Sequence, residues 1–147
     1  MSDVRCHELM RIERFEEIKA WQEARALANQ VHELTILPSF RAYQPLREQL
    51  ERSAISVMAN IAEGFDCQSD REFIRFLFYA LRSTSEIQSH LYVALDRDLM
   101  HENQFEGLYD QCNSIKNLVL GFIRYLRAEG TQLLGDLGPR TSDVGHD

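Results

Sequence analysis

The sequence is poor in cysteine, glycine and proline, and it has no long apolar run. Its 147 residues include only 3 Cys, 7 Gly and 3 Pro. Cys6, Cys67 and Cys112 are too few and too scattered for a disulfide framework or a CxxC metal site, so we expect reduced thiols in a cytoplasmic protein. So few Gly and Pro argue against an all-β fold with many turns. The first residues contain no apolar stretch, so we expect no signal peptide and no membrane partner.

Positive charge is also scarce. The chain has 16 Lys and Arg against 23 Asp and Glu, which gives a formal net charge of −7 at pH 7. Domains that bind nucleic acid through charge are usually strongly basic. The composition therefore disfavours a global attraction to RNA or DNA and leaves open only a local basic patch.

Recognisable catalytic and metal-binding motifs are missing. The sequence has no HExxH, no Glu-x-x-His, no Gly-rich phosphate loop and no nucleophile signature. We therefore expect no catalytic residue, no metal, no cofactor and no enzymatic activity.

A ribonuclease is a distant alternative. Bundle-type ribonucleases use an Arg followed by a His after four to six residues, and two pairs match this spacing: Arg25 with His32, and Arg140 with His146. The second pair falls in the C-terminal tail. Arg25 and His32 border an apolar stripe, where long polar side chains usually extend to water along the edge of a core.

What the sequence does contain is apolar residues at helical spacing in four stretches. They predict helices over about 15–37, from Pro45 to a left-handed cap at Gly64, from Ser69 to 96, and over 102–127. Ser69 and Glu72 form a capping box at the start of the third helix. Short connections between long helices favour antiparallel neighbours, hence an all-α, up-down-up-down four-helix bundle. The predicted organisation is an N-terminal extension (1–14), the bundle (15–128) and a disordered tail (129–147).

The second predicted helix has a polar stripe on an otherwise apolar surface. Four polar side chains lie within about 80° of one another: Arg52, Ser56, Asn60 and Glu63. The rest of the turn is apolar, and such a helix is normally buried on two sides. A small bundle covers one side, and the simplest cover for the other is another copy of the chain. The pattern therefore predicts a homo-oligomer.

The third predicted helix carries a matching polar stripe that includes Arg75, Ser83 and Glu86. An antiparallel register centred on the short turn predicts three contacts across the two helices: Asn60 with Arg75, Ser56 with Tyr79, and Arg52 with Ser83 and Glu86. We expect an Arg52–Glu86 ion pair, and Glu63 near Arg71 or Arg75. One interpretation is a semi-buried network that sets register and subunit geometry. The other is a set of solvated surface pairs worth at most about 1 kcal/mol each.

Four aromatic residues are candidates for packing or subunit contact. Trp21 is the lone tryptophan and lies in the apolar stripe of the first helix, which favours core or interface over a base-stacking role. Phe73 and Phe76 belong to the apolar stripe of the third helix. Phe78 lies off that stripe and is predicted to face a neighbouring subunit.

Four segments resemble one bacterial family. They are KAWQEA at 19–24, QLERSAIS at 49–56, ANIAEG at 59–64 and EFIRFL at 72–77. Together they resemble the four-helix-bundle proteins related to those encoded in intervening sequences of 23S ribosomal RNA genes. The resemblance covers about residues 15–127.

The resemblance implies a left-handed up-down bundle that assembles as a ring of five. The family is also similar to the accessory protein of diversity-generating retroelements, a pentamer with a basic surface that binds nucleic acid and a reverse transcriptase. It therefore implies a non-enzymatic homopentameric scaffold or, alternatively, a nucleic-acid or nucleoprotein adaptor. Glu51 and Cys67 stand where the family often has basic residues, which disfavours the adaptor.

Overall fold

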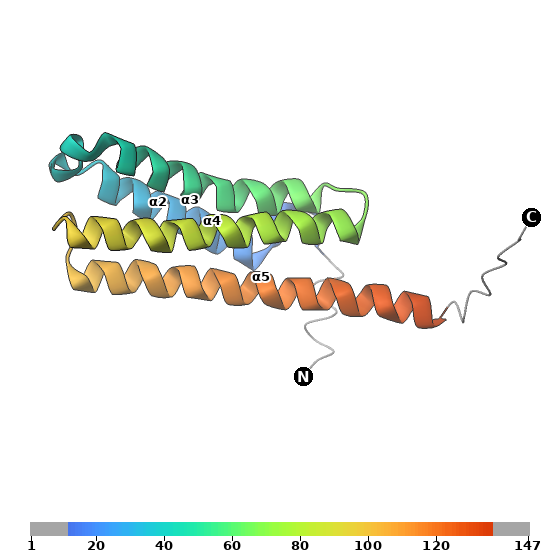
Figure 1. The fold of residues 1–147 in the computed structure, drawn as a ribbon. Helices are drawn as coiled ribbons and strands as arrows, with labels where there is room; N and C mark the ends of the chain where they lie inside the picture. Colours follow the sequence, from blue (N-terminus) through green and yellow to red (C-terminus); the bar gives the residue numbers. More distant parts are fainter. Residues whose placement is uncertain (1–11, 137–147) are drawn as a thin grey trace, which may run out of the picture.

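The computed structural model describes residues 12–136, and this part of the chain is entirely helical, with no strand (Figure 1). The all-α prediction with four long helices is confirmed. Most of the predicted N-terminal extension (1–11) and the end of the predicted tail (137–147) lie outside the described residues. The elements in chain order are η1 (Phe15–Glu17), α2 (Lys19–Thr35), η2 (Pro38–Tyr43), α3 (Gln44–Phe65), α4 (Asp70–Asp96) and α5 (Glu102–Asp136).

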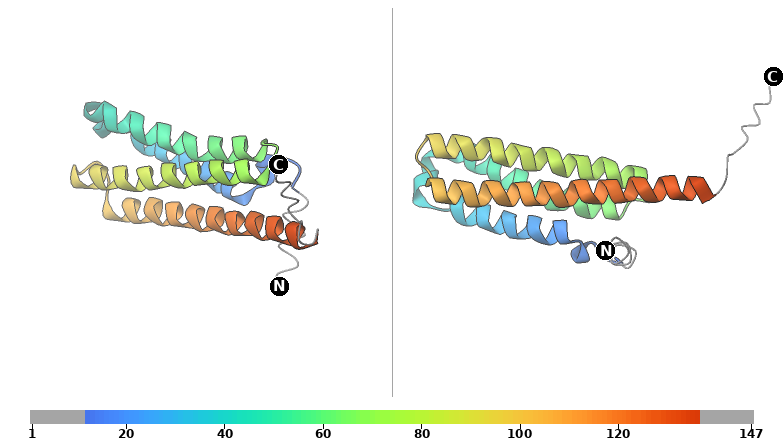
Figure 2. Two further views of the ribbon diagram at one scale, coloured as in Figure 1. Left: turned by 45° about the vertical axis from the view of Figure 1, so that its right-hand side comes forward. Right: turned by 90° about the horizontal axis from the view of Figure 1, so that it is seen from below.

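The four long helices lie side by side in all views (Figures 1 and 2). α2 packs against α3 and α5, α4 packs against the same two helices, and the α3–α4 contact is the most extensive. Each fully buried aliphatic side chain contributes about 1.5–3 kcal/mol to folding. Fully or almost fully buried residues from all four helices fill the centre: Leu27, Val31, Leu50, Val57, Ile61, Leu77, Ile87, Leu91, Ile115, Val119 and Ile123.

α4 begins where the capping box predicts. Ser69 has extended backbone angles, and its Oγ accepts a hydrogen bond from the Glu72 N–H at 3.2 Å. Such a cap satisfies one of the unpaired amides of the first turn and contributes about 1 kcal/mol. The helix ends at Asp96, as the apolar spacing predicts.

α2 is shorter than predicted at both ends. Residues Phe15–Glu17 form a separate 3₁₀ turn, because Ile18 has extended backbone angles (φ −72°, ψ 120°). The helix ends at Thr35 rather than Leu37. Leu37 precedes Pro38, whose ring disfavours helical angles in the preceding residue, and Leu37 is extended (φ −61°, ψ 144°).

Gly64 is not the left-handed cap that its position suggests. It lies inside α3, which continues to Phe65 and is followed by Asp66 in a right-handed conformation. A Cβ atom on Gly64 would be 2.7 Å from Phe73 Cδ2 and 2.8 Å from Phe76 Cβ. The glycine is therefore needed for the close approach of α3 and α4, and this approach depends on tertiary packing that the local sequence does not reveal.

α5 continues beyond the predicted end at Arg127 and reaches Asp136. The start of the predicted disordered tail is therefore helical. A glycine in a helix costs only about 1 kcal/mol, and the first proline after Arg127 is Pro139, so Gly130 does not stop the helix. The last turns of α5 project beyond the other three helices (Figure 1).

Candidate functional site

A chain of hydrogen bonds joins α3 to α4. The side-chain amide of Asn60 donates to Ser56 Oγ at 2.9 Å and to the Ser56 carbonyl at 2.8 Å. Ser83 Oγ on α4 donates to the same Ser56 Oγ at 2.9 Å. Ser83 is buried, and the other two residues are partly buried. The structure thus brings together Ser56, Asn60 and Ser83, three of the residues that the sequence places in a network.

Glu86 joins the same helix contact through a partner that the sequence analysis missed. Ser53 Oγ donates to Glu86 Oε2 at 2.9 Å, and Ser53 is only 2% exposed. The sequence did contain a signal for this contact. Ser53 is a polar residue on the buried stripe of the helix between Leu50 and Val57, where a hydroxyl needs a hydrogen-bond partner.

The predicted Arg52–Glu86 ion pair between the two helices is wrong. Arg52 donates instead to the side chain of Gln49 on its own helix. Arg75 forms an ion pair with Glu72 on α4 at 2.8 Å, and the side-chain amide of Asn60 donates to Ser56 instead. Within the described part of the chain, Glu63 forms no ion pair with Arg71 or Arg75.

The register of the α3–α4 contact explains these differences. Ser56 meets Ser83, which lies one helical turn beyond the predicted Tyr79. Side chains tilt toward the N-terminus of their own helix. In an antiparallel pair, each of two contacting residues therefore lies nearer the C-terminal end of its own helix than a register centred on the turn predicts. The remaining charged residues of the stripe are left at the outer surface.

The outer face of α3 is apolar and uncovered. Ile55 is 59% exposed, and its neighbours Met58, Ala59 and Ala62 are only partly buried. This is the second side of the helix, for which the sequence predicts a partner. No other described segment of the chain covers Ile55.

Trp21 is a core residue. It is 9% exposed, and the Phe15 ring packs edge-on against it with centroids 5.1 Å apart. The Arg25 guanidinium lies over the indole at 5.9 Å. Both its burial and its neighbours argue against a base-stacking platform at this position.

The three phenylalanines of α4 differ in environment. Phe73 is buried and packs edge-on against Phe65 and Phe122. Phe76 is partly buried and contacts Tyr79. Phe78 is 37% exposed, and the Arg127 guanidinium lies 5.6 Å from its ring.

Glu51 is the centre of a polar contact between α2 and α3. Its Oε1 accepts a hydrogen bond from Thr35 Oγ1 at 2.7 Å and lies 3.0 Å from His32 Nδ1. The hydrogen bond from Thr35 lowers the pKa of the Glu51 carboxyl below its ordinary value of 4.5, burial opposes this effect, and His32 and Arg47 lower it further.

The proposed ribonuclease pair is not assembled as a catalytic site. His32 is paired with Glu51, and Arg25 lies over Trp21, with no hydrogen bond between Arg25 and His32. Arg140 and His146 lie outside the described residues.

Cys112 is a poor candidate for a nucleophile. It is buried, and burial raises the pKa of its thiol to about 12, although Lys116 lowers it slightly. Lys116 donates to Gln88 Oε1 at 2.5 Å, and Gln88 donates to Asn113 Oδ1 at 2.8 Å. The thiol is therefore neutral at physiological pH, and a neutral thiol reacts slowly.

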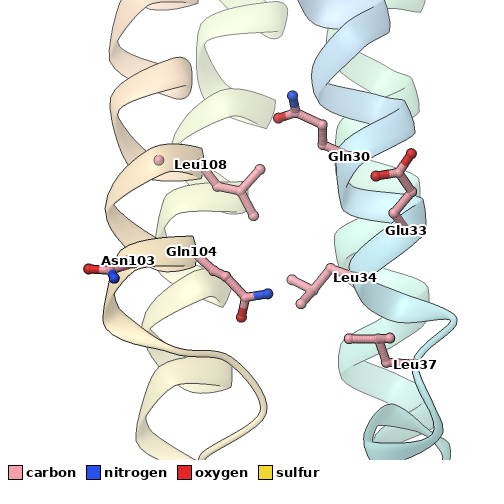
Figure 3. Close-up of a pocket in the computed structure, with 8 residues that line it drawn as sticks. Gln30, Glu33, Leu34, Leu37, Asn103, Gln104 and Leu108 are labelled. Carbon is pink, nitrogen blue, oxygen red and sulfur yellow. The ribbon is translucent and has the colours of Figure 1, made fainter.

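A hollow of about 360 Å³ lies between the end of α2 and the start of α5 (Figure 3). Leu34 on α2 and Leu37, which follows the end of that helix, face Gln104 and Leu108 on α5 across it. Its only titratable residue is Glu33, so no acid–base pair converges there. Among the residues that the structure describes, no three His, Cys, Asp or Glu side chains gather in a way that could hold a metal ion.

The fold and these contacts define an all-helical protein with four long helices in its described part. The chain belongs to the 23S rRNA-intervening sequence protein family, whose model matches residues 16–121. The family resemblance of the four sequence segments is thereby confirmed.

One solved structure with a similar fold is a protein of unknown function from the S23 ribosomal protein family of Bacteroides thetaiotaomicron. It is 22% identical, with a TM-score of 0.64, and the match covers 71% of this chain and 97% of that chain. No curated protein matches the sequence. Between residues 12 and 136, no helix is both long enough and apolar enough to cross a membrane.

Proposed function

We propose that this protein is a non-enzymatic, cytoplasmic scaffold that acts as a homo-oligomer. In this proposal, left-handed up-down-up-down bundles assemble as a ring of five, as the family resemblance implies. The single observation that carries the proposal is the uncovered apolar face of α3 centred on Ile55. Burying a side chain of this size stabilises an interface by about 1.5–3 kcal/mol.

The hydrogen-bond chain beneath this face supports the proposal. Asn60, Ser56 and Ser83 connect α3 to α4 next to the exposed surface. Because these groups are partly buried, each must keep its hydrogen bond, and this requirement favours one register of the two helices. A fixed register keeps the surface rigid, and a rigid surface loses less entropy on association.

The first prediction is that Ile55→Asp disrupts the assembly. Burial of the new carboxylate at an interface would be unfavourable, whereas in the isolated chain it would face water. Sedimentation equilibrium should show a smaller species with unchanged helical circular dichroism. The matched control is Ile36→Asp, since Ile36 is also about half exposed but lies after the end of α2. An Ile55→Asp protein of wild-type mass would contradict the proposal.

A nucleic-acid adaptor is the second candidate, and one observation favours it. Phe78 is exposed beside Arg127, and Arg82 is exposed one turn further along α4. Aromatic rings flanked by arginines are typical of surfaces that bind single-stranded nucleic acid. The net charge of −7 argues against it.

A further inference from the structure

The hollow between the end of α2 and the start of α5 has an apolar floor. Leu34 and Leu108 are buried and point toward one another across it (Figure 3). Leu37, which follows the end of α2, adds an apolar wall that is 40% exposed. The contact between α2 and α5 is the least extensive of the four between neighbouring long helices, and the hollow lies where these two helices face each other. Its volume of about 360 Å³ falls within the range of small-molecule sites.

The rim of the hollow carries one negative charge and no positive charge. Glu33 is the only ionisable residue that lines it, and the other polar residues are neutral amides. Gln30 and Glu33 are three residues apart on α2, so their side chains are neighbours on the helix surface. Within residues 12–136, neither side chain forms a hydrogen bond or an ion pair. These free oxygen acceptors suit a cation, whereas Glu33 would repel an anion with no basic residue to offset the repulsion.

Gly107 lines the hollow on α5, where it contributes no side chain. A glycine within a helix is unfavourable relative to alanine. Packing within the described chain does not require it, because a Cβ atom at this position would meet nothing within 4 Å. Gly64 differs, since a Cβ atom there would collide with α4. A glycine at the wall of the hollow lets a bound molecule approach the backbone of α5 closely.

We propose that this hollow binds a small organic cation with an apolar body, of the primary alkylammonium type. The alkyl chain lies against the three leucines of the floor and wall. The ammonium group lies at the rim, where the Glu33 carboxylate and the Gln30 amide oxygen accept its N–H groups. Apolar walls with a few polar groups that fix orientation are typical of small-molecule sites.

This binding site goes beyond the proposed scaffold and does not depend on it. The residues that line the hollow belong to α2, to α5 and to the connection after α2, and none of them lies on α3 or α4. A ligand in the hollow therefore leaves the outer face of α3 free. The two proposals can be tested separately in the same protein.

The test is a titration with hexylammonium, hexanol and hexanoate, which share an alkyl chain and differ in charge. Proton–nitrogen correlation NMR follows the backbone amide of Gly107 and the side-chain amides of Gln30 and Gln104, because these residues line the hollow. Hexylammonium should shift these signals to saturation. At low salt it should bind about fivefold more tightly than hexanol, the factor that an ion pair with an exposed carboxylate contributes. Hexanoate should bind most weakly of the three.

Two variants separate the roles of charge and apolar surface. Glu33→Gln removes the charge but keeps the shape of the side chain, so it should weaken hexylammonium binding about fivefold and leave hexanol binding unchanged. Leu37→Ser removes the exposed apolar wall, so it should weaken the binding of both probes. The matched control is Glu106→Gln, because Glu106 is exposed next to Gly107 but does not line the hollow. It should bind both probes as the wild type does.

Three results would overturn the inference. They are signal shifts only at residues outside the hollow, equal affinity for hexylammonium and hexanoate, and wild-type affinity for hexylammonium in Glu33→Gln or Leu37→Ser. Both variants should keep the wild-type mass in sedimentation equilibrium, because neither changes the outer face of α3. A protein that associates but does not bind hexylammonium would therefore contradict this inference alone, and a monomer that binds it would contradict only the scaffold.

Discussion

At the scale of single residues, small side chains set the distance between α3 and α4. Gly64 lies against Phe73 and Phe76, and Ser56 meets Ser83 through a direct hydrogen bond. Larger side chains at these positions would separate the helices and break the polar contacts. The serine and the asparagine on the otherwise apolar surface of α3 therefore have a structural role, because their hydrogen bonds connect α3 to α4.

Gly64→Ala should destabilise the protein. The added methyl group would lie 2.8 Å from Phe76 Cβ, an atom close to the backbone that cannot move without shifting α4. Overpacking of this kind costs about 1–3 kcal/mol, which exceeds the roughly 1 kcal/mol gained from helix propensity. Urea unfolding measures the change in the free energy of unfolding.

Gly107→Ala is the matched control for this substitution. Gly107 also lies within a long helix, but a Cβ atom there would meet nothing within 4 Å. This change should raise the free energy of unfolding by about 1 kcal/mol. Equal effects at the two glycines would show that α3 and α4 are not in close contact at Gly64.

Sequence reasoning identified which polar residues belong together better than it identified their partners. Ser56, Asn60 and Ser83 are connected as a group, since helical spacing alone places residues on a common face. Their pairing also depends on the tilt of side chains toward the N-terminus of each helix, which moves the partner of Ser56 by one turn, from Tyr79 to Ser83. Arg52 and Arg75 form contacts on their own helices for the same reason.

At the scale of elements, the helix ends were predicted correctly where the sequence carries a clear local signal for them. The capping box fixes the start of α4, and apolar spacing fixes its end. The prediction placed the end of α2 too late because it did not consider Pro38, which disfavours helical angles at Leu37. The extension of α5 to Asp136 shows that one glycine is a weak stop signal when no proline follows closely.

The contact of Glu51 with Thr35 should make the packing of α2 on α3 dependent on pH. The pKa of Glu51 is lowered in the folded protein, so its contribution to stability is present above its ordinary value of 4.5. This contribution is lost as the pH falls through the lowered pKa. Glu51→Gln should therefore reduce the free energy of unfolding at pH 7 and have a smaller effect at pH 3.

Thermal unfolding followed by circular dichroism at both pH values measures this difference. Glu48→Gln is the matched control, because Glu48 is exposed on the same helix and its side chain accepts a hydrogen bond from Gln44 on that helix rather than from α2. Its effect should be small at both pH values. A constant difference between wild type and Glu51→Gln across this range would contradict the role of the ionised carboxylate.

At the scale of the whole molecule, the fold covers its core but leaves the apolar outer face of α3 uncovered. This surface could be predicted from the apolar pattern of one helix. The places where charged side chains gather could not, because a net charge of −7 does not reveal where the charges lie.

Native mass spectrometry of protein purified without nuclease tests the central claim, self-association, most directly. It weighs the assembly together with anything bound to it. We predict whole multiples of the 17.1 kDa chain, built on five copies, with no additional mass. Bound oligonucleotide would instead favour the adaptor. A single bare chain across the micromolar range would contradict the scaffold proposal and show that the exposed face of α3 needs no partner.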